Sequence, residues 1–273
     1  MSRLERRFAA IKAEGRGAFI PFITSFDPDP ATFQRLLAGL PGAGADVIEI
    51  GVPFTDPAAD GPSVQASGLR ALKQGVSLKK TLAAVAEFRK SDNETPIVLM
   101  GYFNPIYIMG CETFAKAAAE AGVDGLITVD LPPEEEAELR DPIKAAGIDI
   151  VRLIAPTTLD DRLPYVLEHA SGFFYYVSIT GITGTASPTL DSIEAAVKRL
   201  KKHTDLPMAV GFGIRSPEMV GKVSQVADAA VVGSAIVERV TANLDDQGQA
   251  KPDLVEDVLG FVQQLAAGAR NAN

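Results

Sequence analysis

The chain has 273 residues, of which 47% are hydrophobic and 22% are charged, and its formal net charge is −9. This composition is typical of a soluble globular protein with a large core, and the negative charge argues against nucleic acid and anionic membranes as partners. The single cysteine excludes an internal disulfide, and the lack of a signal-like start or a membrane-length apolar run predicts a cytoplasmic protein.

Short apolar, β-branched runs alternate with helical patterns along the chain. The first pattern predicts an extra N-terminal amphipathic helix with Leu4, Phe8 and Ile11 on one side. Eight strands follow, each with the composition of a strand buried on both faces: 18–24, 46–50, 96–101, 124–129, 149–155, 173–179, 207–211 and 228–232. This alternation predicts an α/β protein, a closed parallel (β/α)8 TIM barrel. An open doubly wound sheet is the alternative, but no G-x-G-x-x-G follows the first strand.

No linker or low-complexity segment interrupts this alternation, so we expect residues 1–273 to form a single domain, with about 267–273 as a frayed tail. The two longest gaps between strands follow the second and the sixth strand, which predicts extended loops there. Barrel enzymes build their active sites from the loops that follow strands. The extra length therefore points to the residues that carry chemistry.

Several kinds of chemistry lack their residues in this sequence. No His, Cys or Asp cluster has metal-ligand spacing, so we expect no metal site. No lysine ends a predicted strand, as Schiff-base chemistry would require, and no G-x-S-x-G motif is present. Carboxylates, hydroxyls and backbone amides remain at the strand ends.

Two carboxylates stand out around the second strand. Glu49 lies between Ile48 and Ile50, where apolar neighbours would raise its pKa toward the range that suits a general acid or base. A structural glutamate paired with an arginine or lysine is the alternative. Asp60 follows in the extended loop, and from the residues alone it is equally a catalytic acid or the N-cap of the next helix.

Three glycine-rich segments follow the sixth, seventh and eighth strands, at 181–186, 211–214 and 233–236. In this fold such loops bind phosphate through backbone N–H groups, often beside a short helix N-terminus. Each motif alone also fits a tight turn. Together, with Arg215 as the nearby basic residue, they predict a phosphate cradle. The loop at 180–189, rich in Gly, Thr and Ser, is predicted to be a mobile lid.

Aromatic residues accompany these loops. Phe22, Tyr102, Tyr175 and Phe212 lie at or near strand ends, where core packing is the default and contact with an aromatic substrate the alternative. Residues 102–110, "YFNPIYIMG", are unusually apolar for a loop. They either pack on the barrel rim or form an interface with a partner.

The segment "IEIGVPFTDPAADGP" (48–62) closely resembles the signature of the tryptophan synthase alpha chain family. The resemblance continues, in the family's order, through "FIPFIT", "MGYFNPI", "DLPPEE", "LIAPTT", "GITGT", "GFGI" and "VVGSAIV". It implies a barrel that cleaves indole-3-glycerol phosphate to indole and glyceraldehyde 3-phosphate. It also implies a partner, the beta chain, in an alpha2beta2 heterotetramer. That partner would hold pyridoxal phosphate and receive the indole, whereas this chain would use no cofactor of its own.

The resemblance also implies residue roles. Glu49 matches the catalytic glutamate, as proton shuttle, and Asp60 the catalytic aspartate, which stabilises positive charge at the indole nitrogen. The expected substrate-binding positions, for the indole ring and the phosphate together, are Phe22, Tyr175, Thr183, Gly184, Phe212, Gly213, Gly233 and Ser234. The sequence departs from the family in its first loop, where Phe26 replaces a residue that is usually small or glycine.

Two other functions fit parts of the pattern. A phosphosugar isomerase or epimerase on the same barrel would share the phosphate loops, but its catalytic base pair would differ and the long second loop would have no purpose. A non-catalytic barrel that binds a phosphorylated ligand and regulates its partner would not need Glu49 and Asp60. Release of indole by the isolated chain separates the three.

Overall fold

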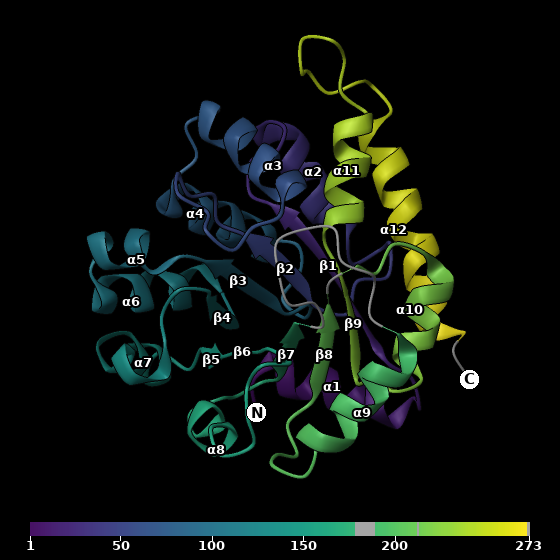
Figure 1. Ribbon diagram of the computed structural model, residues 1–273. Helices are drawn as coiled ribbons and strands as arrows, with labels where there is room; N and C mark the ends of the chain where they lie inside the picture. The colour runs from purple at the N-terminus through teal and green to yellow at the C-terminus, as the bar shows by residue number, and fades with distance from the viewer. Residues whose placement is uncertain (178–188, 212, 272–273) are drawn as a thin grey trace.

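The computed structural model describes residues 1–177, 189–211 and 213–271. Within these residues all strands belong to one parallel sheet in the order β5-β4-β3-β2-β1-β9-β8-β7-β6 (Figure 1). The strands are β1 (Ala18–Thr24), β2 (Ile48–Gly51), β3 (Ile97–Gly101), β4 (Gly125–Thr128), β5 (Asp149–Ile150), β6 (Arg152–Ile154), β7 (Phe174–Val177), β8 (Met208–Gly211) and β9 (Ala229–Val232). Each predicted strand is present, and the predicted barrel is confirmed.

The described sheet has nine strands where the sequence predicts eight, because Val151 divides the fifth strand. Before this residue in the chain, β5 pairs with β4; after it, β6 pairs with β7. The Val151 N–H still donates to the carbonyl of Leu126, 3.0 Å away. The two ends of the sheet are thus one residue apart in the chain, and β1 pairs with β9, so the barrel is nearly closed.

Helices surround the barrel, and five of those described begin at a residue whose side chain caps the first turn. Asp29 accepts from the N–H groups of Ala31 and Thr32, and Ser77 and Ser216 cap their helices similarly. The helices are α1 (Arg3–Ala13), α2 (Pro30–Gly39), α3 (Pro62–Lys73), α4 (Leu78–Arg89), α5 (Phe103–Met109), α6 (Cys111–Ala121), η1 (Pro133–Glu135, a 3-10 turn), α7 (Ala137–Ala145), α8 (Leu163–Leu167), α9 (Leu190–Leu200), α10 (Pro217–Ser224), α11 (Ser234–Ala242) and α12 (Leu254–Arg270).

The C-terminal end of the chain is more ordered than predicted. The frayed tail expected from residue 267 is wrong for 267–270, since α12 continues to Arg270 and Ala269 is fully buried. The reason is tertiary: α12 packs against α10, α11 and α2, which the local sequence of small residues does not reveal. Residues 272–273 lie outside the described residues. In the described part of the chain, no helix is both long and apolar enough to cross a membrane.

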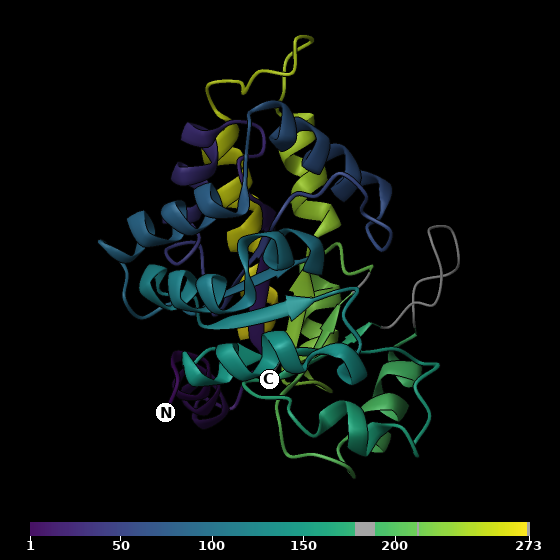
Figure 2. The ribbon, with the colours of Figure 1, turned by 90° about the vertical axis from the view of Figure 1, so that its left-hand side faces the viewer.

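The predicted N-terminal helix is confirmed, and it closes one end of the barrel (Figure 2). Leu4, Phe8 and Ile11 of α1 join the cluster of side chains that fills the barrel interior. Buried aspartates at the strand starts anchor this end; Asp46, for example, accepts from Arg16 at 2.7 and 2.9 Å and from Arg7 at 2.5 Å. The N-terminal end of the barrel is therefore sealed, and the opposite end carries the cavity.

Candidate active site

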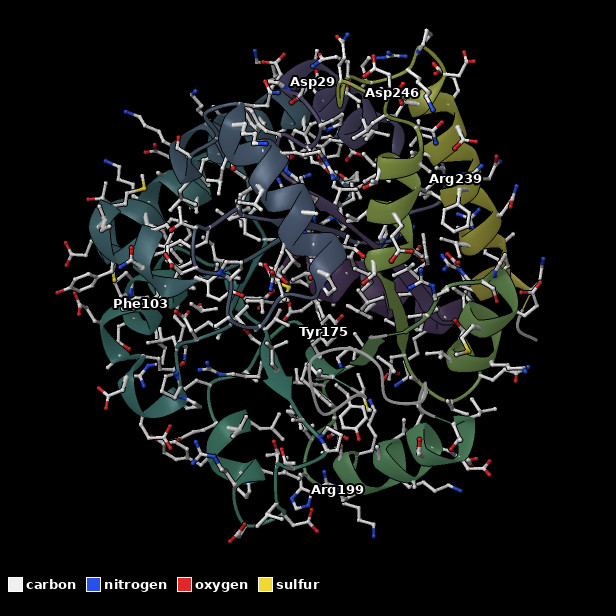
Figure 3. All side chains as sticks on the ribbon, turned by 45° about the horizontal axis from the view of Figure 1, so that its top comes forward. Asp29, Phe103, Tyr175, Arg199, Arg239 and Asp246 are labelled. Carbon is white, nitrogen blue, oxygen red and sulfur yellow. The ribbon has the colours of Figure 1, made fainter. Side chains whose placement is uncertain are left out.

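A cavity of about 850 Å³ lies at the C-terminal ends of the strands. Every described residue of the predicted site lines it: Phe22, Glu49, Asp60, Tyr175, Gly213, Gly233 and Ser234. Figure 3 shows Tyr175 near the middle of the molecule, while Phe103 of α5 lies at its edge. The predicted site residues Thr183, Gly184 and Phe212 lie outside the described residues. So do residues 180–188, almost all of the predicted lid and of the extended loop after the sixth strand.

Glu49 is held inside the barrel by the alternation of β2. Ile48 and Ile50 pack outward against the helices, so the side chain between them points into the cavity. Glu49 is only 2% exposed, and its Oε2 atom has no hydrogen-bond partner among the described residues. Burial raises the pKa of Glu49 to about 8. The alternative of a structural glutamate finds no support, because no described arginine or lysine pairs with this carboxyl.

Phe22 and Tyr175 form two walls of the cavity, and glycines on the neighbouring strands make room for them. Phe22 pairs with Glu49 in the register of β1 and β2, and a Cβ atom at Gly51 would lie 2.5 Å from the tip of its ring. The Tyr175 hydroxyl occupies the space where a side chain at Gly211 would begin. Burial, and secondarily the charge of Glu49, raise the pKa of Tyr175 well above its usual value, so the hydroxyl stays protonated.

Asp60 faces the same cavity from the loop after β2, one residue before the N-cap of α3. The Tyr102 hydroxyl donates to its Oδ1 atom across 3.2 Å and also accepts from the Ala59 N–H at 3.0 Å. Tyr102 in turn stacks on Phe54, with ring centroids 5.3 Å apart. Partial burial raises the pKa of Asp60, and the hydrogen bond from Tyr102 opposes that increase. The two carboxyls therefore have different environments.

The phosphate cradle is represented by two of its three predicted loops. Gly213 has φ +82°, a conformation that favours glycine, and Gly233 is the N-cap of α11. The first N–H groups of α11 lie beside the cavity at Ser234, a suitable position for an anion. The guanidinium of Arg215 is paired with Glu238 of α11, so its charge is already partly neutralised.

Phe26, the departure from the family pattern, does not line the cavity. Its ring stacks on Phe33 of α2 at 5.8 Å and packs against the helix layer. Its backbone has φ +66°, where glycine is the unstrained choice. The structure thus explains why a glycine suits this position, and the side chain leaves the cavity unobstructed.

The sequence analysis named Tyr102 among the strand-end aromatic residues and within the apolar segment 102–110, but it did not predict the hydrogen bond from Tyr102 to Asp60. That segment contains helix α5, so it is not a loop. Part of it packs on the barrel rim, as one alternative expected, and the interface with a partner stays a prediction. Tyr102 and Ile106 are buried, whereas Tyr107 and Ile108 are 57% and 78% exposed. The position of Tyr102 directly after β3, opposite the Asp60 loop, was the available signal for its role.

Comparison with known proteins decides between the candidate functions. The family model of the tryptophan synthase alpha chain matches residues 8–268. The chain belongs to the tryptophan synthase alpha chain family. The tryptophan synthase alpha subunit of Legionella pneumophila str. Paris superposes with a TM-score of 0.91 and 36% identity, covering 99% of each chain. A chain of Mycobacterium tuberculosis tryptophan synthase gives a TM-score of 0.88 and 33% identity, covering 98% of each chain.

A structure from Aquifex aeolicus VF5 matches with a TM-score of 0.88 and 34% identity over 99% of this chain and all of its own. Tryptophan synthase alpha chains are lyases of tryptophan biosynthesis, and this membership assigns the alpha reaction to the chain. The comparisons thus favour the lyase over the isomerase and over the regulatory barrel.

Proposed function

We propose that this chain cleaves indole-3-glycerol phosphate by carboxylate acid/base catalysis, with Glu49 as proton shuttle and Asp60 as partner of the indole nitrogen. The observation that carries the proposal is the buried Glu49 carboxyl without a described charge partner, facing the same cavity as Asp60. A group with a pKa near 8 holds its proton at neutral pH and can both give and take one. Asp60, which accepts a hydrogen bond from Tyr102, serves as the ionised carboxylate.

The reaction is a retro-aldol cleavage that needs no net proton. Glu49 donates its proton to carbon 3 of the indole ring, and positive charge develops at the ring nitrogen, whose N–H faces the Asp60 carboxylate. The bond between carbon 3 and the glycerol carbon then breaks, and its electron pair restores the aromatic ring. The Glu49 carboxylate takes the proton of the adjacent glycerol hydroxyl, which becomes the aldehyde of glyceraldehyde 3-phosphate. Glu49 thereby returns to its starting state.

The other residues of the cavity are proposed to bind the indole ring and the phosphate of the substrate. The aromatic and apolar walls at Phe22 and Tyr175 suit the indole ring, and the α11 N-terminus with Gly213 and Gly233 suits the phosphate. Amide groups solve the problem that a protein of net charge −9 faces in holding an anion. Thr183, Gly184 and Phe212 remain predicted members of this site.

The proposal includes a partner. The matched M. tuberculosis structure is described as a tryptophan synthase. We propose that this chain likewise joins a beta chain in the cytoplasm, as an alpha2beta2 assembly, and passes indole to it. Pyridoxal phosphate would belong to the beta chain. That this chain needs no cofactor of its own stays a prediction.

The test is indole release from indole-3-glycerol phosphate by the isolated chain and by two variants. Glu49→Gln and Asp60→Asn should each lower kcat by at least about a hundredfold, the scale of general acid/base groups. Glu87→Gln, which changes an exposed side chain of α4, is the matched control and should retain wild-type rates. A Glu49→Gln enzyme that is folded and turns over within a few-fold of wild type would contradict the proposed role of Glu49.

A further inference from the structure

Helix α3, which begins two residues after Asp60, buries few apolar side chains against the barrel. Its only buried residues are Ser67 and Ala71, both small. The next helix, α4, buries six residues, including Leu82, Val85 and Phe88. Apolar burial is the main force that fixes helices on a barrel, and α3 has little of it. Polar contacts must therefore determine where α3 lies.

These contacts come from one stripe of α3, at Ser63, Ser67 and Arg70, whose spacings of four and three residues place them on the same face. Ser63 donates to Glu238 Oε1 of α11 at 2.8 Å. The Ser67 hydroxyl lies 2.7 Å from that of Thr24 at the end of β1. The stripe thus joins α3 both to the first strand and to α11, which lies beside it (Figures 1 and 3).

Arg70 makes both connections at once. Its Nε and Nη2 atoms donate to the two carboxylate oxygens of Asp27 at 2.7 and 2.9 Å, a bidentate pair in which Asp27 is 4% exposed. Nη2 also donates to Thr241 Oγ1 of α11 at 3.0 Å. One side chain therefore connects the loop after β1, the helix that follows Asp60 and the helix whose N-terminus faces the proposed phosphate site.

We infer that Arg70 is a positioning residue for the alpha reaction: it fixes α3 against the first loop and α11, and so sets the place of Asp60 relative to the phosphate site. Asp60 lies just two residues before α3 begins, and Gln65 of α3 donates to its carbonyl at 2.8 Å. A shift of α3 is therefore passed to the Asp60 loop. Arg70 does not line the cavity, so it acts through Asp60 and not on the substrate.

The kinetic test compares Arg70→Gln with wild type. Misplacement of a catalytic group by about 1 Å costs up to roughly a hundredfold, so kcat should fall about 10- to 100-fold while KM changes less than about threefold. Arg70→Lys keeps the positive charge but cannot make the bidentate pair with Asp27, so it should recover part of the rate. Arg35→Gln, in an exposed ion pair with Glu256, is the matched control and should behave as wild type. A kcat within threefold of wild type, or an effect confined to KM, overturns the inference.

A double-mutant cycle separates positioning of Asp60 from general damage. If Arg70 acts through Asp60, Arg70→Gln should lower the residual kcat of Asp60→Asn by less than about threefold. If the double variant instead lost kcat by the product of the two single losses, Arg70 would act independently of Asp60, and the inference would be overturned. Should Arg70→Gln fail to fold, Thr241→Val keeps the side-chain shape and removes the connection of Arg70 to α11, together with the bond of this hydroxyl to the Val237 carbonyl. It should then give a smaller kcat loss that is likewise absent in the Asp60→Asn background.

The inference rests on the proposed role of Asp60, so one measurement is independent of turnover. Hydrogen exchange follows the amides of Ala58, Ala59 and Asp60, each hydrogen-bonded in the structure. They should exchange faster in Arg70→Gln than in wild type or Arg35→Gln, whether or not the enzyme releases indole. Unchanged exchange would refute the role of Arg70. Absence of indole release by wild type would refute only the proposed function.

Discussion

At the scale of single residues, Glu49 carries an energetic cost of burial that the proposed role as proton shuttle would explain. A carboxyl that is fully buried without a charge partner destabilises the folded state once the unfolded chain ionises it. The sequence already predicted this residue and the direction of its pKa shift, because a carboxylate between two isoleucines at a strand end is penalised by desolvation. The position of Tyr102 after the third strand indicated that it lies near the site, but its pairing with Asp60 depends on how two loops meet, which the sequence does not show.

This cost gives a testable dependence of stability on pH. The pKa of Glu49 is about 8 in the folded protein against an ordinary value of 4.5, so between these two values folding requires the carboxyl to regain its proton. Its contribution to the free energy of unfolding is therefore lost as pH rises from 4.5 to 8. Glu49→Gln has no proton to regain, so its advantage in unfolding free energy over wild type should grow across this window to about 4 kcal/mol.

Urea unfolding of both proteins between about pH 5 and pH 8 measures this difference. Glu87→Gln, an exposed glutamate paired with Lys90, is the control and should track wild type at every pH. A constant difference between Glu49→Gln and wild type across the range would show that the carboxyl is not buried as an acid with a raised pKa.

At the scale of elements, the strands could be predicted from the sequence, whereas a strand break, one short helix and the contacts of another helix could not. Runs such as Ile97–Gly101 and Ala229–Val232 are buried on both faces, and such continuous apolar stretches identify parallel strands to within two residues. The break at Val151 leaves no such sign, because it depends on pairing with the neighbours. Helix α5 was also missed, since its apolar residues resemble a packed loop. Helix α3 was located, but its polar attachment depends on residues of α11 far along the chain.

The proposed phosphate cradle is formed by a helix N-terminus and a loop, and it leads to another prediction. If backbone amides of α11 and the Gly213 loop hold the phosphate, Gly213→Val should raise KM at least about tenfold, through bulk in the cradle and strain at φ +82°. Arg215→Gln should change KM less than about threefold, because Glu238 already pairs with this guanidinium. Steady-state kinetics on indole-3-glycerol phosphate measure both.

A second glycine separates the two causes. Gly248 has φ +77° in the loop after α11, a Cβ atom there would have no neighbour within 4 Å, and the residue does not line the cavity. Gly248→Val carries a similar backbone strain without bulk near the substrate, so its KM should stay at the wild-type value. A large KM effect from Arg215→Gln with none from Gly213→Val would move the phosphate from the amides to the side chain.

At the scale of the whole molecule, the barrel has a closed end and an open end. Helix α1 and the buried Asp46 network seal the N-terminal end, whereas the C-terminal end holds the cavity and both proposed catalytic carboxyls. Helix α5 follows β3 at this open end and exposes Tyr107 and Ile108 side by side. We propose that these two adjacent exposed apolar side chains belong to the surface that binds the beta chain, the partner expected for this family.

We therefore expect Tyr107→Asp and Ile108→Asp each to weaken association with the beta chain by about 2 kcal/mol, since each places an unpaired charge in the interface. Isothermal titration measures the affinity, and circular dichroism checks that the variants fold. Tyr165→Asp, a partly exposed aromatic on α8, is the matched control and should bind as wild type does. Wild-type affinity in both α5 variants would assign this helix to the barrel rim alone.

The same helix explains why binding should also speed the reaction. Tyr102 is the N-cap residue of α5, and its hydroxyl contacts both Ala59 and Asp60. A partner that fixes α5 thereby fixes the group that orients the Asp60 loop, which couples the interface to the active site. Saturating beta chain should raise the kcat of wild type. It should raise that of Tyr102→Phe much less, because the phenyl ring fills the same space but can no longer donate to the Asp60 carboxylate. Equal activation of the two proteins by the beta chain would show that the coupling takes another path.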